Sequence, residues 1–213
     1  LQVRLKPARS VSRGMRYWLV ILLLLAVIPL SGQEVQRLTL DDAMELAGFF
    51  PRIRLLTWEN SHNLSGGRVI PFEVMEATTA RARAHRLAIH TDGARIWNVV
   101  AATGIDGPAW GGLTDTIQFC FSKGLGAPVG SIVCGPADVI AEIRYLRERM
   151  GGAMRQAGVI AAAARIGLAE RARLEEDHVL AQKLAMGFAE RFPGSIDPAD
   201  VETNLVLGDF AAL

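Results

Sequence analysis

The chain has 213 residues, of which 50% are hydrophobic and 21% charged, and its net charge is +1. This composition allows one hydrophobic core and excludes disordered and collagen-like chains. The 23 basic and 22 acidic residues nearly balance, and no basic patch alternates with aromatic residues, which argues against nucleic-acid binding. Cys120 and Cys134 lack the spacing of metal ligands and lie in apolar strand patterns, so we expect both to be small buried residues.

Residues 1–33 form a hydrophobic segment of the kind that directs export. Two arginines precede an apolar run at 18–30 and small residues follow it, a pattern typical of a signal peptide that starts at Met15. Pro29 ends the run before the roughly 17–25 apolar residues that a membrane-spanning helix needs. We therefore expect a hydrophobic, signal-like helix, with a signal anchor or a buried core helix as alternatives.

Residues 34–50 are predicted to form a short helical segment. Thr39 can cap a helix whose first turn contains Asp41 and Asp42. This block resembles the start of mature outer-membrane efflux proteins. Residues before about 48 thus resemble the precursor of such a protein, and contact with a membrane is expected only through this hydrophobic N-terminal part.

From residue 51 on, strand and helix patterns alternate. The predicted strands are 53–58, 87–90, 116–121, 130–134 and 202–207, and the predicted helices are 73–86, 136–150, 154–170 and 173–192. This alternation favours an α/β fold with a mostly parallel sheet covered by helices. We assign residues 51–195 to one large domain, which we take to be incomplete, and residues 196–213 to the start of a smaller C-terminal domain.

The strongest chemical signal is a lysine and an aspartate that each follow a predicted strand. Lys123 lies in the glycine-rich stretch FCFSKGLGAPVG, and Asp92 ends the run LAIHTD. A lysine shielded at a strand end can attack an aldehyde, and a carboxylate can keep a pyridine nitrogen protonated. The glycines are expected to let the backbone approach a ring closely. Together these residues are the minimal equipment for pyridoxal phosphate chemistry. The alternatives are a solvated loop lysine and a simple Asp-Gly turn.

Three further residues are candidates for the same site. His62 lies in the loop after the first predicted strand, where a neutral imidazole could accept a proton. Arg95 and Arg155 could hold anions, and we expect Arg155 early in a helix, where the helix dipole favours a phosphate. The remaining histidines, at 85, 90 and 178, are predicted to be structural.

Five blocks of the sequence resemble a known enzyme family. They read TWENSHNLSGGRVIP, IHTDGARIWN, FCFSKGLGAPVGS, MGGAMRQAGV and DPADVETN. From about residue 51 on, the chain resembles the low-specificity L-threonine aldolases, which are pyridoxal phosphate enzymes with the aspartate-aminotransferase-like fold. The resemblance implies a cytoplasmic homo-oligomeric lyase that cleaves the β-hydroxy amino acids L-threonine and L-allo-threonine to glycine and acetaldehyde by a retro-aldol reaction.

The resemblance also implies a role for each candidate residue. Lys123 would be the Schiff-base lysine and Asp92 the partner of the pyridine nitrogen. His62 would lie beside the β-hydroxyl group of the substrate. Arg95 would lie near the phenolic oxygen of the cofactor or the substrate carboxylate, and Arg155 near the cofactor phosphate.

The chain departs from the family in several places. Glu148 stands where the family has a lysine, and Ala153 replaces the third glycine of a triple-glycine turn. The family's phosphate-binding loop and most of its small domain have no counterpart in this sequence. We therefore interpret the chain as a chimera of an efflux-protein precursor and an aldolase core with impaired activity. The alternatives are an inactive exported or membrane-tethered protein, a β-eliminating lyase and a hydroxymethyltransferase.

Overall fold

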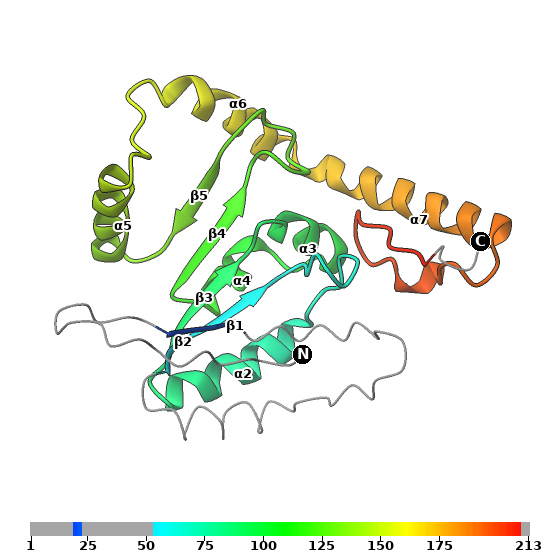
Figure 1. Ribbon diagram of the computed structural model, residues 1–213, viewed down its shortest axis with the longest axis horizontal. Helices are drawn as coiled ribbons and strands as arrows, with labels where there is room; N and C mark the ends of the chain where they lie inside the picture. The colour runs from blue at the N-terminus through cyan, green and yellow to red at the C-terminus, as the bar shows by residue number, and fades with distance from the viewer. Residues whose placement is uncertain (1–18, 23–52, 210–213) are drawn as a thin grey trace, which may run out of the picture.

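The computed structural model describes residues 19–22 and 53–209, whose centre is a five-stranded sheet in the order β1-β2-β3-β4-β5 (Figure 1). The strands are β1 (Leu19–Leu22), β2 (Ile53–Glu59), β3 (Ala88–Asp92), β4 (Thr116–Cys120) and β5 (Ser131–Cys134). The first four strands are parallel, and β5 pairs antiparallel with β4. The α/β fold with a mostly parallel sheet, predicted from the sequence, is therefore confirmed.

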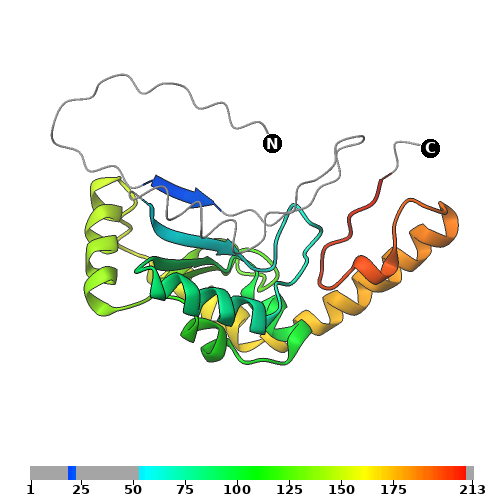
Figure 2. The same cartoon turned by 90° about the horizontal axis from the view of Figure 1, so that it is seen from below.

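Three helices bury one face of this sheet. The helices of the described residues are α2 (Phe72–Ala84), α3 (Ile96–Thr103), α4 (Gly107–Gly112), α5 (Ala137–Arg149), α6 (Gly158–Ala169) and α7 (Leu174–Arg191). Apolar side chains of α2, α3 and α4 form one core with β2 and β3, in which Met75, Ile89 and Val99 are completely buried. Figure 2 shows these helices together on one side of the strands, whereas α7 leads away from the sheet.

Helices α3 and α4 were not predicted, although short local signals define both. Gly104 ends α3 in the left-handed conformation at a φ of 70°, where a glycine carries no steric penalty. The side chain of Asp106 then caps α4 by accepting a hydrogen bond from the backbone of Ala109 (2.9 Å). The two helices link β3 to β4 and supply Trp110, one of the largest buried side chains.

The predicted burial of the two cysteines is wrong for Cys134, which is exposed, whereas Cys120 is half-buried. The reason is the position of β5, which pairs only with β4 among the described strands and has mostly exposed side chains. An apolar strand pattern predicts burial only when a neighbouring layer covers the strand.

The predicted N-terminal helix meets the described residues only at Leu19–Leu22. These four residues form β1, a strand that pairs with β2, and not a turn of helix. The rest of the hydrophobic segment and the helix predicted within 34–50 lie outside the described residues. Within the described residues, no helix is long and apolar enough to cross a membrane.

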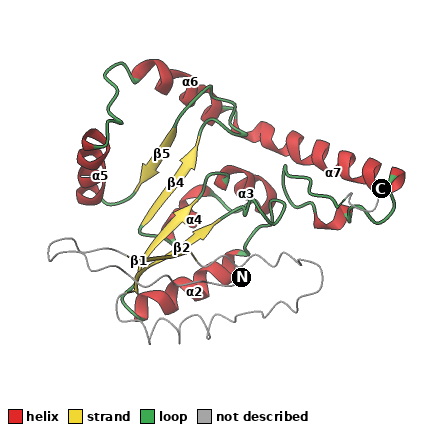
Figure 3. Ribbon diagram, in the orientation of Figure 1, coloured by secondary structure: helices red, strands yellow, loops and turns green. Residues whose placement is uncertain are grey.

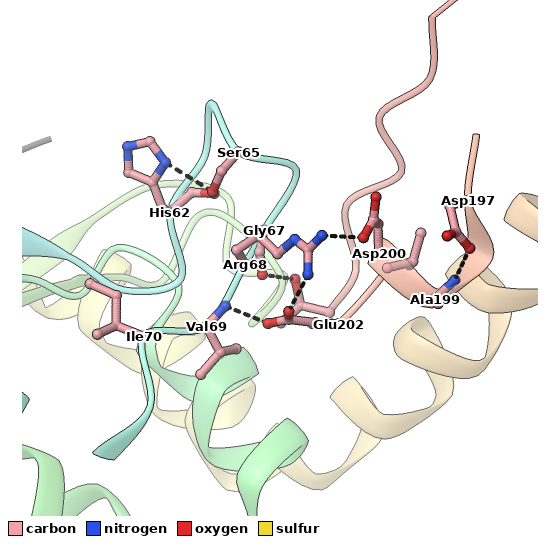
Figure 4. Close-up of polar contacts among 12 residues, drawn as sticks. His62, Ser65, Gly67, Arg68, Val69, Ile70, Asp197, Ala199, Asp200 and Glu202 are labelled. Atoms are coloured by element: carbon pink, nitrogen blue, oxygen red, sulfur yellow. Dashed lines mark hydrogen bonds and ion pairs between the residues drawn. The ribbon is translucent and has the colours of Figure 1, made fainter. Parts of the chain in front are cut away.

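The strand predicted at 202–207 is wrong, because this segment is a loop after a 3₁₀ turn at Pro198–Asp200 (Figure 3). Its side chains bind the loop that follows β2 (Figure 4). Glu202 accepts hydrogen bonds from the guanidinium of Arg68 (2.8 Å) and the backbone of Val69 (2.7 Å). Thr203 donates to the carbonyl of Gly67 (2.9 Å). The polar residues Glu202 and Thr203 are therefore committed to tertiary contacts and not to a strand pair.

Arg68 is the centre of this contact, since its guanidinium also binds the carboxylate of Asp200. The hydrogen bond that Arg68 donates to Glu202 raises the pKa of Arg68, and the charge of Asp200 adds to this effect. Gly67 allows the close approach, because a β-carbon at this position would collide with the hydroxyl of Thr203. We call the contacts of Arg68, Gly67 and Val69 with residues 200–203 the C-terminal clamp.

Replacement of Glu202 by alanine is expected to destabilise the protein. It leaves Arg68 with one acid partner and the backbone N–H of Val69 without its acceptor. Because the ion pair is partly exposed, we expect a loss of about 1–2 kcal/mol in the free energy of unfolding, measured with urea. Glu176→Ala on the exposed face of α7 is the control, with a change below about 0.5 kcal/mol. Equal losses in the two variants would contradict the clamp.

Stability is expected to fall as the pH falls through the range of histidine titration. Burial lowers the pKa of both His90 and His178 from the ordinary value of 6.5, although neighbouring acids oppose this effect. The folded state therefore binds fewer protons than the unfolded state, and protonation of the unfolded state favours unfolding below about pH 6.5. His178→Gln should flatten the decrease in unfolding free energy between about pH 7.5 and pH 5.5. The exposed His85→Gln is the control for the loss of a histidine, and a slope in His178→Gln equal to that of the original chain would refute the assignment.

Candidate active site

The carboxyl ends of β2, β3 and β4 meet at one edge of the sheet because the three strands are parallel. The strands end at Glu59, Asp92 and Cys120. Backbone hydrogen bonds tie the loops to this edge: Asn60 donates to the carbonyl of Asp92 (3.1 Å), and Gly93 donates to that of Gln118 (2.8 Å). Ligands of open α/β sheets collect at such an edge, so four of the five predicted site residues lie where a site is expected.

Asp92 is the last residue of β3 and is half-buried. Its Oδ1 accepts hydrogen bonds from the backbone N–H of Ala94 (3.0 Å) and from the side-chain amide of Gln118, its partner in the register of β4. Both donors reach the same oxygen, which fixes the carboxylate and leaves Oδ2 for another donor. A protonated ring nitrogen is a donor of this kind.

His62 is buried in the loop after β2, and its surroundings set its tautomer. The hydroxyl of Ser65 donates to the carbonyl of His62 (3.2 Å) and lies 3.0 Å from Nδ1, so that Nδ1–H is the donor to this hydroxyl. Nε2 then carries a lone pair in the neutral ring. It is buried and has no hydrogen-bond partner among the described residues, since the carboxylate of Glu59 lies 3.7 Å away.

Arg95 follows β3 and reaches back to the same loop. Its guanidinium donates to the side-chain carbonyl of Asn63 (2.8 Å) and lies 3.9 Å from the carboxylate of Glu59. Glu59 thus lies between His62 and Arg95 and contacts both at ion-pair distance. The guanidinium is therefore held at the edge of the sheet, where it could bind a carboxylate.

Lys123 lies in the turn that follows β4, and its side chain is exposed. Backbone hydrogen bonds fix the turn: Gly126 donates to the carbonyl of Lys123 (2.8 Å), and Ala127 donates to that of Phe121 (3.0 Å). The expected shielding of the lysine is therefore wrong for this chain, although an ordered turn presents the lysine at the same edge as Asp92.

Arg155 lies apart from the other predicted residues of this chain. We expected it early in a helix, but it is exposed in a turn before α6. Figure 1 shows the connection between α5 and α6 well away from the carboxyl end of β2. Within this chain the structure therefore places Lys123, Asp92, His62 and Arg95 at one edge of the sheet, and Arg155 elsewhere.

The residues present fit pyridoxal phosphate. Oδ2 of Asp92 is suited to a protonated ring nitrogen, and Lys123 to the aldehyde group. Two buried polar atoms of the His62 loop, Nε2 of His62 and the hydroxyl of Ser61, have no partner among the described residues. Since buried polar atoms are rarely left unpaired, these two atoms indicate a site for a polar ligand.

Sequence reasoning missed the residues that orient the predicted ones. Gln118 fixes Asp92, Asn63 and Glu59 hold Arg95, and Arg173 contacts the turn of Lys123. Only Gln118 left a usable signal, as a polar residue in an apolar strand that pairs with β3. The other contacts depend on tertiary structure and have no local pattern.

The chain is similar to named threonine aldolases. Low-specificity L-threonine aldolase 1 of Arabidopsis thaliana is 40% identical over 162 residues, which are 76% of this chain and 45% of the relative. The chain therefore spans less than half the length of this curated relative.

Solved structures give the same picture of the fold. A candidate aromatic amino acid beta-eliminating lyase/threonine aldolase from Exiguobacterium sp. 255-15 matches with a TM-score of 0.67 and 26% identity over 76% of this chain and 46% of the other. A candidate L-allo-threonine aldolase from Listeria monocytogenes matches with a TM-score of 0.69 and 23% identity over 78% of this chain and 46% of the other. At this identity the second match supports the fold alone.

The model of the beta-eliminating lyase family matches residues 26–212, which are most of the sequence. The α/β sheet, the position of Asp92 and Lys123 at one edge and the similarity to threonine aldolases agree with this match. The chain belongs to the beta-eliminating lyase family.

Proposed function

We propose that the chain is part of a pyridoxal phosphate-dependent lyase that cleaves the carbon–carbon bond of L-threonine or L-allo-threonine, giving glycine and acetaldehyde. The observation that carries this proposal is the arrangement of Asp92, Lys123 and His62 around one edge of the sheet. The proposal draws further support from the names of the similar aldolases.

Each residue has a distinct task in the proposed reaction. Lys123 would hold the cofactor through Nζ, and Asp92 would accept a hydrogen bond at Oδ2 from its ring nitrogen. Arg95 orients the substrate by binding its carboxylate, for which a guanidinium provides paired donors. The cofactor supplies an electron sink for the bond that breaks at the α-carbon of the substrate.

His62 is the proposed base. Cleavage of a β-hydroxy amino acid to an aldehyde requires the loss of the hydroxyl proton. Nε2 of His62 can accept this proton, because Nδ1–H is already committed to the hydroxyl of Ser65. Glu59, at 3.7 Å from Nε2, can stabilise the imidazolium that results.

The remaining expectations of the sequence analysis are part of this proposal. Arg155 would bind the cofactor phosphate. Because it lies apart from Lys123, Asp92, His62 and Arg95 in this chain, other residues would have to complete the phosphate site around it. We expect a homo-oligomer, since α5 buries none of its residues and Tyr145 and Leu146 are among several exposed apolar side chains on α5, α6 and α7. The division into domains at residues 51–195 and 196–213, the cytoplasmic location and the chimeric origin with reduced activity remain predictions.

A β-eliminating lyase or a hydroxymethyltransferase would use the same lysine and aspartate. Release of ammonia and pyruvate identifies the first, and dependence on tetrahydrofolate identifies the second. The unpaired Nε2 of His62 favours the aldolase, because retro-aldol cleavage needs a base at the β-hydroxyl group. An inactive exported protein would show none of the three activities.

Labelling of Lys123 tests the cofactor. The chain has three lysines, Lys6, Lys123 and Lys183. After incubation with pyridoxal phosphate and reduction with borohydride, we expect the label on Lys123, mapped by peptide mass spectrometry. Lys183 on α7 is the internal control, and Lys123→Arg should lose the label. Equal labelling of all three lysines would reject the proposal.

Asp92→Asn is expected to separate cofactor attachment from catalysis. An amide cannot stabilise the ring-nitrogen proton as a carboxylate does, so threonine cleavage should fall about 100-fold or more while the label on Lys123 persists. Acetaldehyde release measures the first effect, and borohydride labelling the second. Asp138→Asn on exposed α5 is the control; equal cleavage by the two variants would exclude the role of Asp92.

A further inference from the structure

The turn that carries Lys123 is enclosed by helices that come much later in the chain. Residues 171–173 form a 3₁₀ turn that leads into α7, and the guanidinium of Arg173 donates to the carbonyl of Gly124 (3.2 Å). This carbonyl belongs to the residue directly after Lys123. The contact from the start of α7 therefore reaches the peptide between Gly124 and Leu125, one residue beyond the proposed cofactor lysine.

The glycines of the turn make room for this contact. A β-carbon on Gly126 would collide with the guanidinium of Arg173, and one on Gly124 would lie 2.7 Å from the Cδ2 atom of Leu174. Gly126 also has a φ of 74°, which favours glycine. The sequence analysis expected these glycines to admit a cofactor ring, but the structure shows that they admit the start of α7.

The contact is anchored on both sides of the turn. Leu174 is only 1% exposed and Asn98 of α3 only 2%, and both lie beside Gly124. Asn98 in turn donates through Nδ2 to Nε2 of His178 on α7 (3.1 Å). Helices α3 and α7 are thus packed against each other beneath the turn, so buried Leu174 fixes the backbone from which the exposed side chain of Arg173 reaches the turn.

We propose that Arg173 is a positioning residue for Lys123: its bond to the carbonyl of Gly124 holds the turn one peptide beyond the lysine and so fixes the backbone that carries it. This inference rests on the proposed function for the role of Lys123. The lysine side chain is long and flexible, so its productive position depends on the backbone that carries it. Arg173 does not contact the substrate in this proposal and acts only through the turn.

The neighbouring Arg171 provides a matched control. It has the same charge and lies in the same 3₁₀ turn, but its guanidinium donates to the carbonyl of Leu168 (3.1 Å) and lies over the ring of Trp97 at 5.4 Å. Removal of Arg171 therefore takes a charge and a stacking contact from this region without touching the carbonyl of Gly124.

The first measurement follows the turn in the full chain without cofactor. In Arg173→Ala, amide hydrogen exchange at Gly126, which donates to the carbonyl of Lys123, should accelerate about fivefold, as expected for loss of one hydrogen bond to a charged donor. Arg171→Ala should stay within about twofold of the original chain, and Arg173→Lys should restore most of the protection. Unchanged exchange in Arg173→Ala, or equal acceleration in Arg171→Ala, would overturn the proposal.

The second measurement follows the lysine itself. Acetylation of Lys123 by acetic anhydride, relative to Lys183, should change in Arg173→Ala by about threefold or more, and Arg173→Lys should return it towards the original ratio. A ratio that is the same in all variants would show that Arg173 does not position the lysine. Neither measurement needs pyridoxal phosphate. Failure of the original chain to take the cofactor label would therefore reject the proposed function while these two results still decide the positioning by Arg173.

Discussion

Parallel pairing of β2, β3 and β4 is the constraint on which the candidate active site depends. Parallel strands end at the same edge, so the loops that follow them must converge there. The register places Glu59 opposite Asp92 and Asp92 opposite Gln118. His62 and Lys123 are far apart in the sequence, and only the sheet brings their loops to one edge. A shift of this register by one residue would turn Asp92 to the other face and remove the site.

Sequence patterns predicted the strands and helices whose residues show the local periodicity and end signals of these elements. Strands β2 to β5 and helices α2, α5, α6 and α7 were expected within a few residues of their observed bounds. Helix α3 was missed because it has only eight residues, IWNVVAAT, and a short, mostly apolar run does not distinguish a helix from a buried strand. The strand at 202–207 was wrongly predicted, because the polar residues Glu202 and Thr203 bind Arg68 and Gly67 and do not pair with a strand.

The residues of the candidate site likewise fall into two groups, those that the sequence predicts and those that depend on tertiary contacts. Lys123 and Asp92 could be found from the sequence, since each lies in a short stretch with a recognisable strand before it. Their supporting residues could not, because the bond from Gln118 needs the register of two strands and the bond from Arg173 needs the packing of α7 on α3. The glycines beside Lys123 illustrate the limit: the sequence indicates that space is required there, but it does not say which atoms fill the space.

The C-terminal clamp places part of the site under the control of residues that the sequence analysis assigned to another domain. His62 lies in the loop between Asn60 and Ile70, which the side chain of Asn60 closes through two hydrogen bonds to Ile70. Glu202 and Thr203, close to the end of the described chain, hold the other side of this loop through hydrogen bonds to Val69 and Gly67. Movement of residues 200–203 must break charged and backbone contacts of this loop. The position of the proposed base therefore depends on the C-terminal segment as well as on β2, and the contacts of this loop cross the predicted domain boundary.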